Sequence, residues 1–357
     1  MTPQSTRETG NLVKLALSSP SATMWTQVLL VLQVLRLPLT LLSLTPTAIL
    51  LSIVSIGPLP KHVAFIMDGN RRWARSLHSN AAKQQQKQQQ QRKNRNYKGA
   101  QNAEPLHSGS PASPSSAPVI SGHEFGFQAL KRVLDLCLQL GSIEHVTVYA
   151  FAIDNFKRKA DEVDELMTLT RRSLLELAGH GEVLARHHAR LKVVGRKEML
   201  PLDVQEAVKR LEDMTSENPG PTLNICIPYS SRDEMTGAIR ARTLACLAGR
   251  SDADGFSSGD GVADQKRAHI KAEDDEVALL DREMLLAHSP PVDILVRTSG
   301  VHRLSDFMLW QITAQTLIRF VPTYWPVFGL WDLLPILLQW QTLQFRRWLI
   351  RKIDEEV

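Results

Sequence analysis

The chain has 357 residues and a mass of 40.0 kDa, enough for one large domain or two ordinary ones with a buried core. Hydrophobic residues make up 43% and charged residues 22%, so the chain is neither collagen-like nor disordered throughout. Its three cysteines, Cys137, Cys226 and Cys246, exclude a disulfide framework, and no two have metal-site spacing. The net charge of +5 allows phosphates or lipids as partners but does not indicate nucleic acid, and no nucleic-acid partner is expected.

The N-terminal region has two parts. Residues 1–22 are rich in Ser, Thr and Pro and predict a disordered tail. Residues 23–58 are almost wholly apolar, and no charged residue follows Arg36 within them, which predicts a membrane-associating segment. Arg36, Pro38 and Pro46 favour a broken, interfacial helix over a straight span. A buried core helix and a cleaved signal peptide are the alternatives, although no small-residue cleavage site precedes Pro58.

Two stretches without apolar periodicity look like inserts. The first covers residues 79–121 and contains a Gln run over 84–91, a basic cluster and a Ser/Pro-rich piece. The second covers about 249–275 and is rich in Asp, Gly and Ser. Neither composition can bury enough surface to order itself, so both predict solvated loops. The basic part of the first insert can also contact anionic lipid.

Between the inserts, short apolar runs alternate with helical periodicity. Strands are predicted over 62–67, 146–151, 191–194, 223–227 and 293–296, and helices over 127–138, 162–180 and 203–214. Gly141 should end the first of these helices. The alternation predicts an α/β domain over 60–345, with a mostly parallel central sheet flanked by helices and a ligand site beyond the carboxyl ends of the strands. A C-terminal tail, 346–357, is expected after it.

The strongest motif follows the first strand and reads Asp68-Gly69-Asn70-Arg71-Arg72. Arginines and the backbone N–H groups of a following helix can hold phosphate oxygens. A lone carboxylate can anchor Mg²⁺, which prefers oxygen ligands. The motif therefore indicates a diphosphate site. A capped turn with a surface arginine pair is the alternative, because Asp-Gly and Asn are ordinary turn residues.

The string from His62 to Arg75 resembles the first signature of the cis-prenyltransferases, the family of undecaprenyl and dehydrodolichyl diphosphate synthases. Similar blocks follow in the same order: Gly122-His123-Glu124-Phe125-Gly126, residues 149–158, residues 223–234 and residues 293–311. Residues 325–331 resemble the eukaryotic ending of the fold. The resemblance implies the cis-prenyltransferase fold and a Mg²⁺-dependent prenyltransferase.

The resemblance also implies roles for residues at matching positions. The primer diphosphate would be held by Asp68, Gly69, Asn70, Arg71 and Arg72, with Asp68 also organising Mg²⁺. The second diphosphate, that of isopentenyl diphosphate, would be held by Arg297, Arg303 and Ser305. Catalytic roles fall on Asp68, Asn70, His123 and Asn155, and further substrate contacts on Trp73, Phe156 and Arg158. Taken alone, His123 is better read as a core or capping histidine; its block context gives it the catalytic role.

The implied activity is repeated addition of isopentenyl diphosphate to an allylic primer such as farnesyl diphosphate. The product would be long-chain dehydrodolichyl diphosphate, for dolichol and protein glycosylation. The final proton acceptor stays open between Asp68 and a diphosphate oxygen. The growing chain needs an apolar tunnel, which Val163, Leu166, Met167 and Leu169 can line; a plain core face is the alternative.

The sequence departs from the family pattern at several points. Ala152 replaces a serine, Asp154 replaces a glutamate, and the first insert replaces a short connector. Residues 311–319 lack the glutamate that bacterial homodimers use as a metal ligand, and no Arg-x-Gly follows Gln344. The resemblance therefore implies a heteromer, in which a Nogo-B-receptor-like subunit supplies Arg-x-Gly.

Two rival functions are a non-catalytic scaffold of the same family and an unrelated phosphate-binding α/β protein. A scaffold would not need Asp68 and the late arginines, which are present. An unrelated phosphate-binding protein would not account for Arg297, Arg303 and Ser305 far downstream of the first motif. A dolichol-type product and unpaired cysteines predict the endoplasmic reticulum membrane, with the catalytic domain on the cytosolic side.

Overall fold

The computed structural model describes residues 46–99, 120–177, 179, 182–249 and 277–356, in two units, 1–58 and 59–357, which are described separately. The described part of the first unit contains helix α3, Pro46–Val54. None of the helices in the described ranges is both long and apolar enough to cross a membrane. The predicted tail 1–22 and residues 23–45 of the predicted membrane-associating segment lie outside the described residues.

The second unit is built on six parallel strands in the order β3-β4-β2-β1-β5-β6. The strands are β1 His62–Ile66, β2 His145–Tyr149, β3 Arg190–Val194, β4 Thr222–Cys226, β5 Ile294–Arg297 and β6 Leu317–Phe320. After β1, the chain places β2, β3 and β4 on one side of β1, and it then places β5 and β6 on the other side. In such sheets ligands bind beyond the carboxyl ends of the strands at this reversal. Ile66 is paired with both Tyr149 and Arg297 there.

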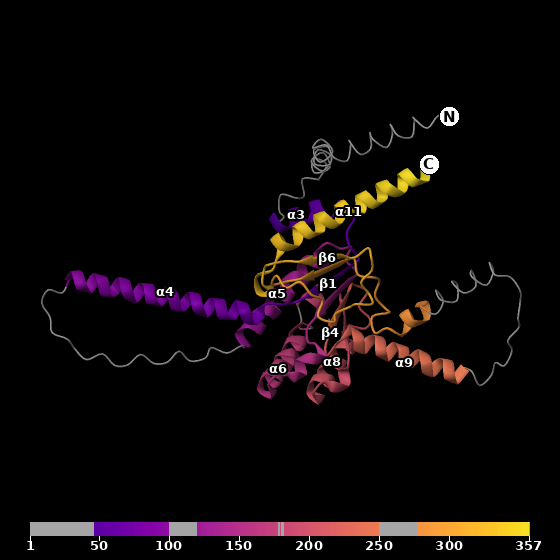
Figure 1. The fold of residues 1–357 in the computed structure, drawn as a ribbon, viewed down its shortest axis with the longest axis horizontal. Helices are drawn as coiled ribbons and strands as arrows, with labels where there is room; N and C mark the ends of the chain where they lie inside the picture. The colour runs from indigo at the N-terminus through magenta and orange to yellow at the C-terminus, as the bar shows by residue number, and fades with distance from the viewer. Residues whose placement is uncertain (1–45, 100–119, 178, 180–181, 250–276, 357) are drawn as a thin grey trace, which may run out of the picture. The chain divides into compact units, whose positions relative to one another are not determined.

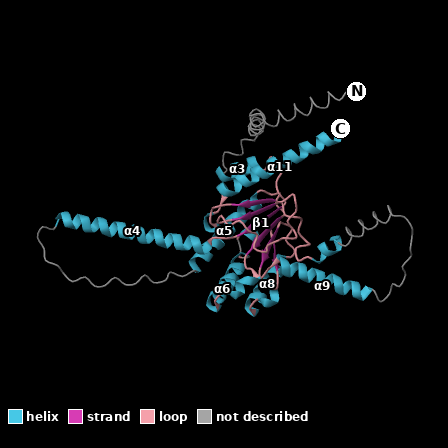
Figure 2. Cartoon of the chain, in the orientation of Figure 1, coloured by secondary structure: helices cyan, strands magenta, loops and turns pink. Residues whose placement is uncertain are grey.

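Helices surround the sheet (Figures 1 and 2). The α-helices are α4 Asn70–Gly99, α5 Ile120–Gln139, α6 Ala160–Leu177, α7 Val183–Arg186, α8 Leu202–Thr215, α9 Ser231–Gly249 and α11 Leu330–Glu356, and the 3-10 turns are η2 Ile153–Lys157, η3 Lys197–Met199 and η5 Trp325–Val327. Alternate residues of β1 face opposite sides. Phe65 meets Trp325 and Phe328 at ring separations of 5.8 and 6.1 Å, whereas Ile66 joins the core around Tyr229. Both faces are buried, as a parallel sheet requires.

The predicted α/β class, with a mostly parallel sheet flanked by helices, is confirmed, and each predicted strand and helix has a counterpart. The membrane-associating segment that the prediction adds to this fold stays a prediction. Gly141 follows α5 with φ +72°, the left-handed conformation of a helix stop. Two boundary predictions were wrong. The first insert is not a loop from residue 79, because α4 continues to Gly99, and residues 346–356 are not a separate tail, because α11 runs through them. The remainder of the two inserts, 100–119 and 250–275, lies outside the described residues.

Candidate active site

The turn after β1 is tightly held. Gly69 has φ +108°, and a Cβ there would lie 2.6 Å from Cδ1 of Tyr324, so the position requires glycine. The buried Thr298 hydroxyl donates to the Asp68 carbonyl at 2.7 Å and accepts the Asp68 N–H at 2.9 Å. Helix α4 begins at Asn70 directly after this turn, so the N-terminus of the helix and Asp68 share the carboxyl end of β1.

Asp68 lies between two guanidinium groups from different elements. Its Oδ1 accepts from Arg72 at 3.1 Å and its Oδ2 accepts from Arg297 at 2.8 Å. Burial alone would raise the pKa of Asp68, but the hydrogen bonds and charges of Arg297 and then Arg72 hold it below the usual value. The carboxylate is therefore ionised at neutral pH. The Arg297 side chain is 4% exposed, so removing its partner would leave a buried charge.

Arg297 also organises a second cluster. Its Nη1 donates to the Arg303 carbonyl and to Ser305 Oγ, both at 2.6 Å. Arg303 Nε donates to the same hydroxyl oxygen at 3.2 Å. A single buried guanidinium therefore joins the turn after β1 to the loop after β5, and these are the two positions at which the sequence predicts diphosphate binding.

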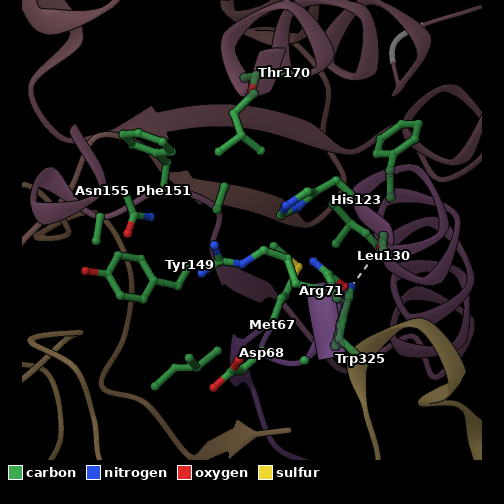
Figure 3. A pocket seen from close by; sticks show the side chains of 18 of the residues that line it. Met67, Asp68, Arg71, His123, Leu130, Tyr149, Phe151, Asn155, Thr170 and Trp325 are labelled. Carbon is green, nitrogen blue, oxygen red and sulfur yellow. Dashed lines mark hydrogen bonds between the residues drawn. The ribbon is translucent and has the colours of Figure 1, made fainter. Parts of the chain in front are cut away.

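A cavity of about 480 Å³ opens between these clusters and the helices. Among the described residues that line it, Asp68 is the one carboxylate. Six arginines line the same cavity, Arg71, Arg72, Arg75, Arg158, Arg297 and Arg303; Arg72 and Arg297 contact Asp68, whereas Arg71 and Arg158 pair with Glu162 of α6. The apolar lining comes mainly from Phe127, Leu130, Leu166, Leu169, Leu174 and Leu177, on α5 and α6. Figure 3 shows Asp68 at one side of this space and Thr170, from α6, at the opposite side. The cavity thus suits a ligand with an anionic head and an apolar body.

The neutral polar groups lie near the cationic end. His123 has its pKa lowered to about 4, first by burial and then by the charges of Arg158 and Arg71, so its ring is uncharged at neutral pH. Within the described structure, His123 Nε2 and Asn70 Oδ1 are buried without a hydrogen-bond partner. The Asn70 side chain lies close to α5 because residue 126 is glycine, where a Cβ would come within 2.6 Å of Asn70 Oδ1. The neutral His123 ring and the Asn70 amide therefore lie among the lining residues as uncharged polar groups beside the arginines.

Most of the predicted site residues line this cavity: Asp68, Gly69, Asn70, Arg71, Arg72, His123, Asn155, Arg158, Arg297, Arg303 and Ser305. Trp73 and Phe156 do not. Trp73 packs edge-on against Phe125 with ring centroids 4.8 Å apart, and Phe156 packs edge-on against Phe151 at 5.0 Å.

The predicted tunnel face is divided, and some lining residues were not predicted. Leu166 and Leu169 line the cavity, Val163 does not, and Met167 is a buried core residue. The prediction omitted Arg75 and Tyr149, which line the cavity, and Thr298. All three lie within the motif blocks identified in the sequence. Their side chains can donate hydrogen bonds, and this property could have marked them as candidate site residues.

The described lining of the site offers one carboxylate, Asp68, to a divalent cation. In the part of the chain that the structure describes, no group of three or more His, Cys, Asp or Glu side chains is placed to hold a metal ion. Mg²⁺ commonly binds through one or two carboxylates together with substrate phosphates and water. A single ionised Asp68 beside a diphosphate pocket fits that mode.

Fold and site together define an α/β protein that binds diphosphates bearing apolar chains. The family model for undecaprenyl diphosphate synthase matches residues 112–348, and the chain belongs to this prenyltransferase family, whose members are generally Mg²⁺-dependent. The match begins at residue 112, within the predicted first insert, so the turn after β1 is connected to the family by the longer alignments with individual relatives.

Among its relatives is a dehydrodolichyl diphosphate synthase complex subunit of Schizosaccharomyces pombe, 34% identical over 82% of this chain and 89% of the relative. The corresponding Homo sapiens complex subunit is 36% identical over 81% of this chain and 69% of the relative. Lavandulyl diphosphate synthase of Lavandula x intermedia, solved with dimethylallyl diphosphate, has the same fold with a TM-score of 0.57 and 24% identity, over 79% of this chain and 95% of that one.

Proposed function

We propose that this chain is the catalytic subunit of a dehydrodolichyl diphosphate synthase. It adds isopentenyl diphosphate repeatedly to an allylic primer such as farnesyl diphosphate, and the long polyprenyl product serves dolichol synthesis and protein glycosylation. The observation that carries this proposal is the cavity, whose lining joins two arginine-containing clusters to apolar side chains of α5 and α6. The names of the relatives from Schizosaccharomyces pombe and Homo sapiens support it.

The two clusters take different substrates. The primer diphosphate lies at the turn after β1, where Arg71, Arg72 and the first N–H groups of α4 donate to its oxygens. The diphosphate of isopentenyl diphosphate lies at Arg303 and Ser305. Because Arg297 contacts both Asp68 and Ser305, it holds the two diphosphates side by side, which brings the reacting carbons together.

The reaction needs positioning and charge rather than a protein nucleophile. The bond between the allylic carbon and the diphosphate oxygen breaks, C4 of isopentenyl diphosphate bonds to that carbon, and C2 loses a proton to give a cis double bond. The guanidinium groups stabilise the negative charge on the departing diphosphate. Asp68 would hold Mg²⁺, and the bound ion would supply further charge stabilisation to the diphosphate.

The proton acceptor left open by the sequence is better assigned to a diphosphate oxygen than to Asp68. Both Asp68 oxygens already accept from guanidinium groups, and its pKa is lowered. A carboxylate held in this way is a weak base. Asp68 therefore serves to orient Arg72 and Arg297 and to carry the metal.

Burial of the growing chain drives its movement along the apolar lining. At about 0.8 kcal/mol per buried CH₂, each five-carbon unit contributes roughly 3 to 4 kcal/mol. Leu166 and Leu169 of α6 lie on that path. A long polyprenyl chain exceeds what a cavity of about 480 Å³ can enclose, so its distal end leaves the cavity as synthesis proceeds.

The proposal includes a partner and a membrane. The relatives from Schizosaccharomyces pombe and Homo sapiens are named as complex subunits, which supports a heteromer with a Nogo-B-receptor-like subunit that supplies an Arg-x-Gly motif. The apolar residues 23–58 and the lipid nature of the product support attachment to the endoplasmic reticulum membrane. The buried free thiols of Cys137 and Cys226 are compatible with its cytosolic side.

The deciding experiment is incorporation of labelled isopentenyl diphosphate onto farnesyl diphosphate. The full chain is assayed alone and with the partner, with and without Mg²⁺, beside Asp68→Ala. Long product that requires partner and Mg²⁺ and disappears in Asp68→Ala is the expected result. Product from the chain alone would remove the partner from the proposal, and no product under any pairing would favour a scaffold. Fractionation and protease protection of the native protein test its location.

A further inference from the structure

The loop after β5 contains an unusual concentration of left-handed backbone. Four of its non-glycine residues have positive φ: Ser299 at 77°, Ser305 at 53°, Asp306 at 60° and Met308 at 50°. Such conformations cost energy in non-glycine residues and persist only where surrounding contacts enforce them. The same loop carries Ser305 of the second cationic cluster, so the contacts that hold the backbone there also determine the geometry of that cluster.

Asp306 makes the most polar contacts in this part of the loop. Its side chain is 18% exposed and points to the N-terminus of α9. Oδ2 accepts from Ser230 Oγ at 2.5 Å and from Arg232 Nε at 3.2 Å, and Oδ1 accepts the Arg232 N–H at 3.2 Å. Its backbone carbonyl accepts the Ser231 N–H at 2.9 Å. A carboxylate at the start of a helix is favourably placed, so Asp306 attaches the loop to α9.

The neighbouring residues hold the loop from the opposite side. Phe307 is fully buried and stacks on Tyr149 with ring centroids 4.6 Å apart. The Tyr149 hydroxyl lies 3.3 Å from the Ser305 carbonyl and 3.2 Å from the Tyr229 carbonyl, which share its one hydrogen. Ser305 therefore lies between the aromatic contact from β2 and the polar contact to α9. These contacts hold the Ser305 backbone at a position from which its hydroxyl oxygen accepts from Arg297 and Arg303.

We propose that Asp306 is a positioning residue for the diphosphate of isopentenyl diphosphate. This role for Asp306 rests on the proposed function, and it adds to the site a residue outside the cavity lining. By attaching the loop to the N-terminus of α9, Asp306 enforces the left-handed backbone at 305 and 306 and so directs the Ser305 hydroxyl and the Arg303 guanidinium into the cavity. Without the carboxylate the loop relaxes toward ordinary φ values, and the second cluster loses its geometry while the turn after β1 keeps its own contacts.

The test is steady-state kinetics of the full chain with the partner subunit, varying each substrate at saturating levels of the other. Asp306→Ala is expected to raise KM for isopentenyl diphosphate about tenfold, with KM for farnesyl diphosphate within about twofold of wild type. Asp306→Asn keeps one acceptor oxygen and should recover most of the loss. Ser230→Ala removes one bond and should give an intermediate rise. Equal rises in both KM values, or no change for isopentenyl diphosphate, would overturn the proposal.

Asp293→Ala is the matched control. Asp293 also accepts backbone N–H groups, from Lys61 and His62 at 2.7 and 3.1 Å, but at the opposite end of β5. Its loss should lower Tm and leave both KM values unchanged. If Asp306→Ala does not fold, Ser230→Ala decides, and an unchanged KM there overturns the proposal.

Failure of the proposed function is recognised separately, because the wild-type complex would then make no product. Calorimetric titration of the wild type and Asp306→Ala with inorganic pyrophosphate tests the loop in that case. Loss or weakening of one of two pyrophosphate sites in the variant would support the positioning role, and an unchanged number of sites with unchanged affinities would contradict it.

Discussion

At the scale of single residues, Arg297 connects the two halves of the site. Its guanidinium donates to Asp68, to Ser305 and to the Arg303 carbonyl, and a lysine ammonium cannot reproduce this planar set of donors. Arg297→Lys should therefore raise KM for both substrates, each by about tenfold or more. Arg303→Lys, which alters the second cluster alone, should affect isopentenyl diphosphate only. Steady-state kinetics with each substrate varied will distinguish these patterns, and selective behaviour of Arg297→Lys would contradict the bridging role.

Gly69 tests the turn after β1. Alanine there combines an unfavourable φ of +108° with a Cβ 2.6 Å from the Tyr324 ring. We expect Gly69→Ala to displace Asp68 and Tyr324, lower kcat/KM at least about 100-fold and lower Tm. Gly237→Ala is the matched control, because nothing lies within 4 Å of a Cβ at that position in α9; it should match or exceed wild-type stability. Normal activity of Gly69→Ala would show that the turn is not required.

Much of the site was predictable from sequence because its residues are contiguous. Asp68 to Arg72 form one string, and Arg297, Arg303 and Ser305 fall within another. The direction of each side chain was not predictable. Trp73 belongs to the first string, yet the rotation of α4 places it against Phe125, and only the packed structure determines that rotation. Asp306 also lies within the second string, but its contact with α9 depends on a left-handed backbone conformation. An aspartate in the sequence does not predict that conformation.

At the scale of elements, the two halves of α4 differ. Its first turn carries the site residues, and Ala74 is buried, whereas Lys83, Gln84 and Gln86 are exposed. Gln86→Pro should reduce helical circular dichroism and leave activity within about twofold of wild type, since a proline acts on the surrounding turn. Ala74→Pro, the paired variant, should abolish activity because it breaks the turn that bears Arg71 and Arg72. Loss of activity in Gln86→Pro would assign a function to the Gln-rich half.

The errors in element boundaries have physical causes. Composition predicted a loop from residue 79 because the Gln run has no apolar face, but Gln, Lys, Arg and Ala are good helix formers and neither Gly nor Pro occurs between 79 and 98. Helix α4 can therefore continue out of a packed first turn. Strand β6, Leu317–Phe320, was not predicted because it is a short edge strand with Arg319 exposed, so its apolar run is interrupted.

At the scale of the whole molecule, a buried polar network joins strands at the end of the sheet opposite the site. His62 is fully buried; its Nδ1 donates to the Pro290 carbonyl at 2.6 Å and its Nε2 accepts from Thr147 Oγ1 at 2.7 Å. Asn224 donates to the same hydroxyl oxygen at 3.0 Å and accepts from His288 Nε2 at 2.9 Å. The network has a donor for each acceptor only while the His62 ring is neutral, because protonated Nε2 would face Thr147 as a second donor.

This arrangement predicts loss of stability in mild acid. Burial lowers the pKa of His62 to about 4 and that of His288 to about 4, and it also lowers the pKa of His145. A histidine whose folded pKa lies below its unfolded value of 6.5 favours the fold fully above pH 6.5. That contribution is lost as pH falls from 6.5 toward 4, because the unfolded chain takes up the proton first. For His62 the loss at pH 5 is about 2 kcal/mol.

Urea unfolding of the full chain at pH 7.5 and pH 5.0 measures this loss. His62→Gln should be less stable than wild type at pH 7.5, because it disrupts the network, yet should lose less stability between the two pH values. His302→Gln is the matched control: the His302 ring is exposed and stacks only on Phe320, so the variant should keep the wild-type slope. A wild-type free energy of unfolding that stays constant from pH 7.5 to 5.0 would show that the buried network accepts the proton without cost. In that case the connection between β1, β2 and β4 at this end of the sheet would not depend on neutral imidazole rings.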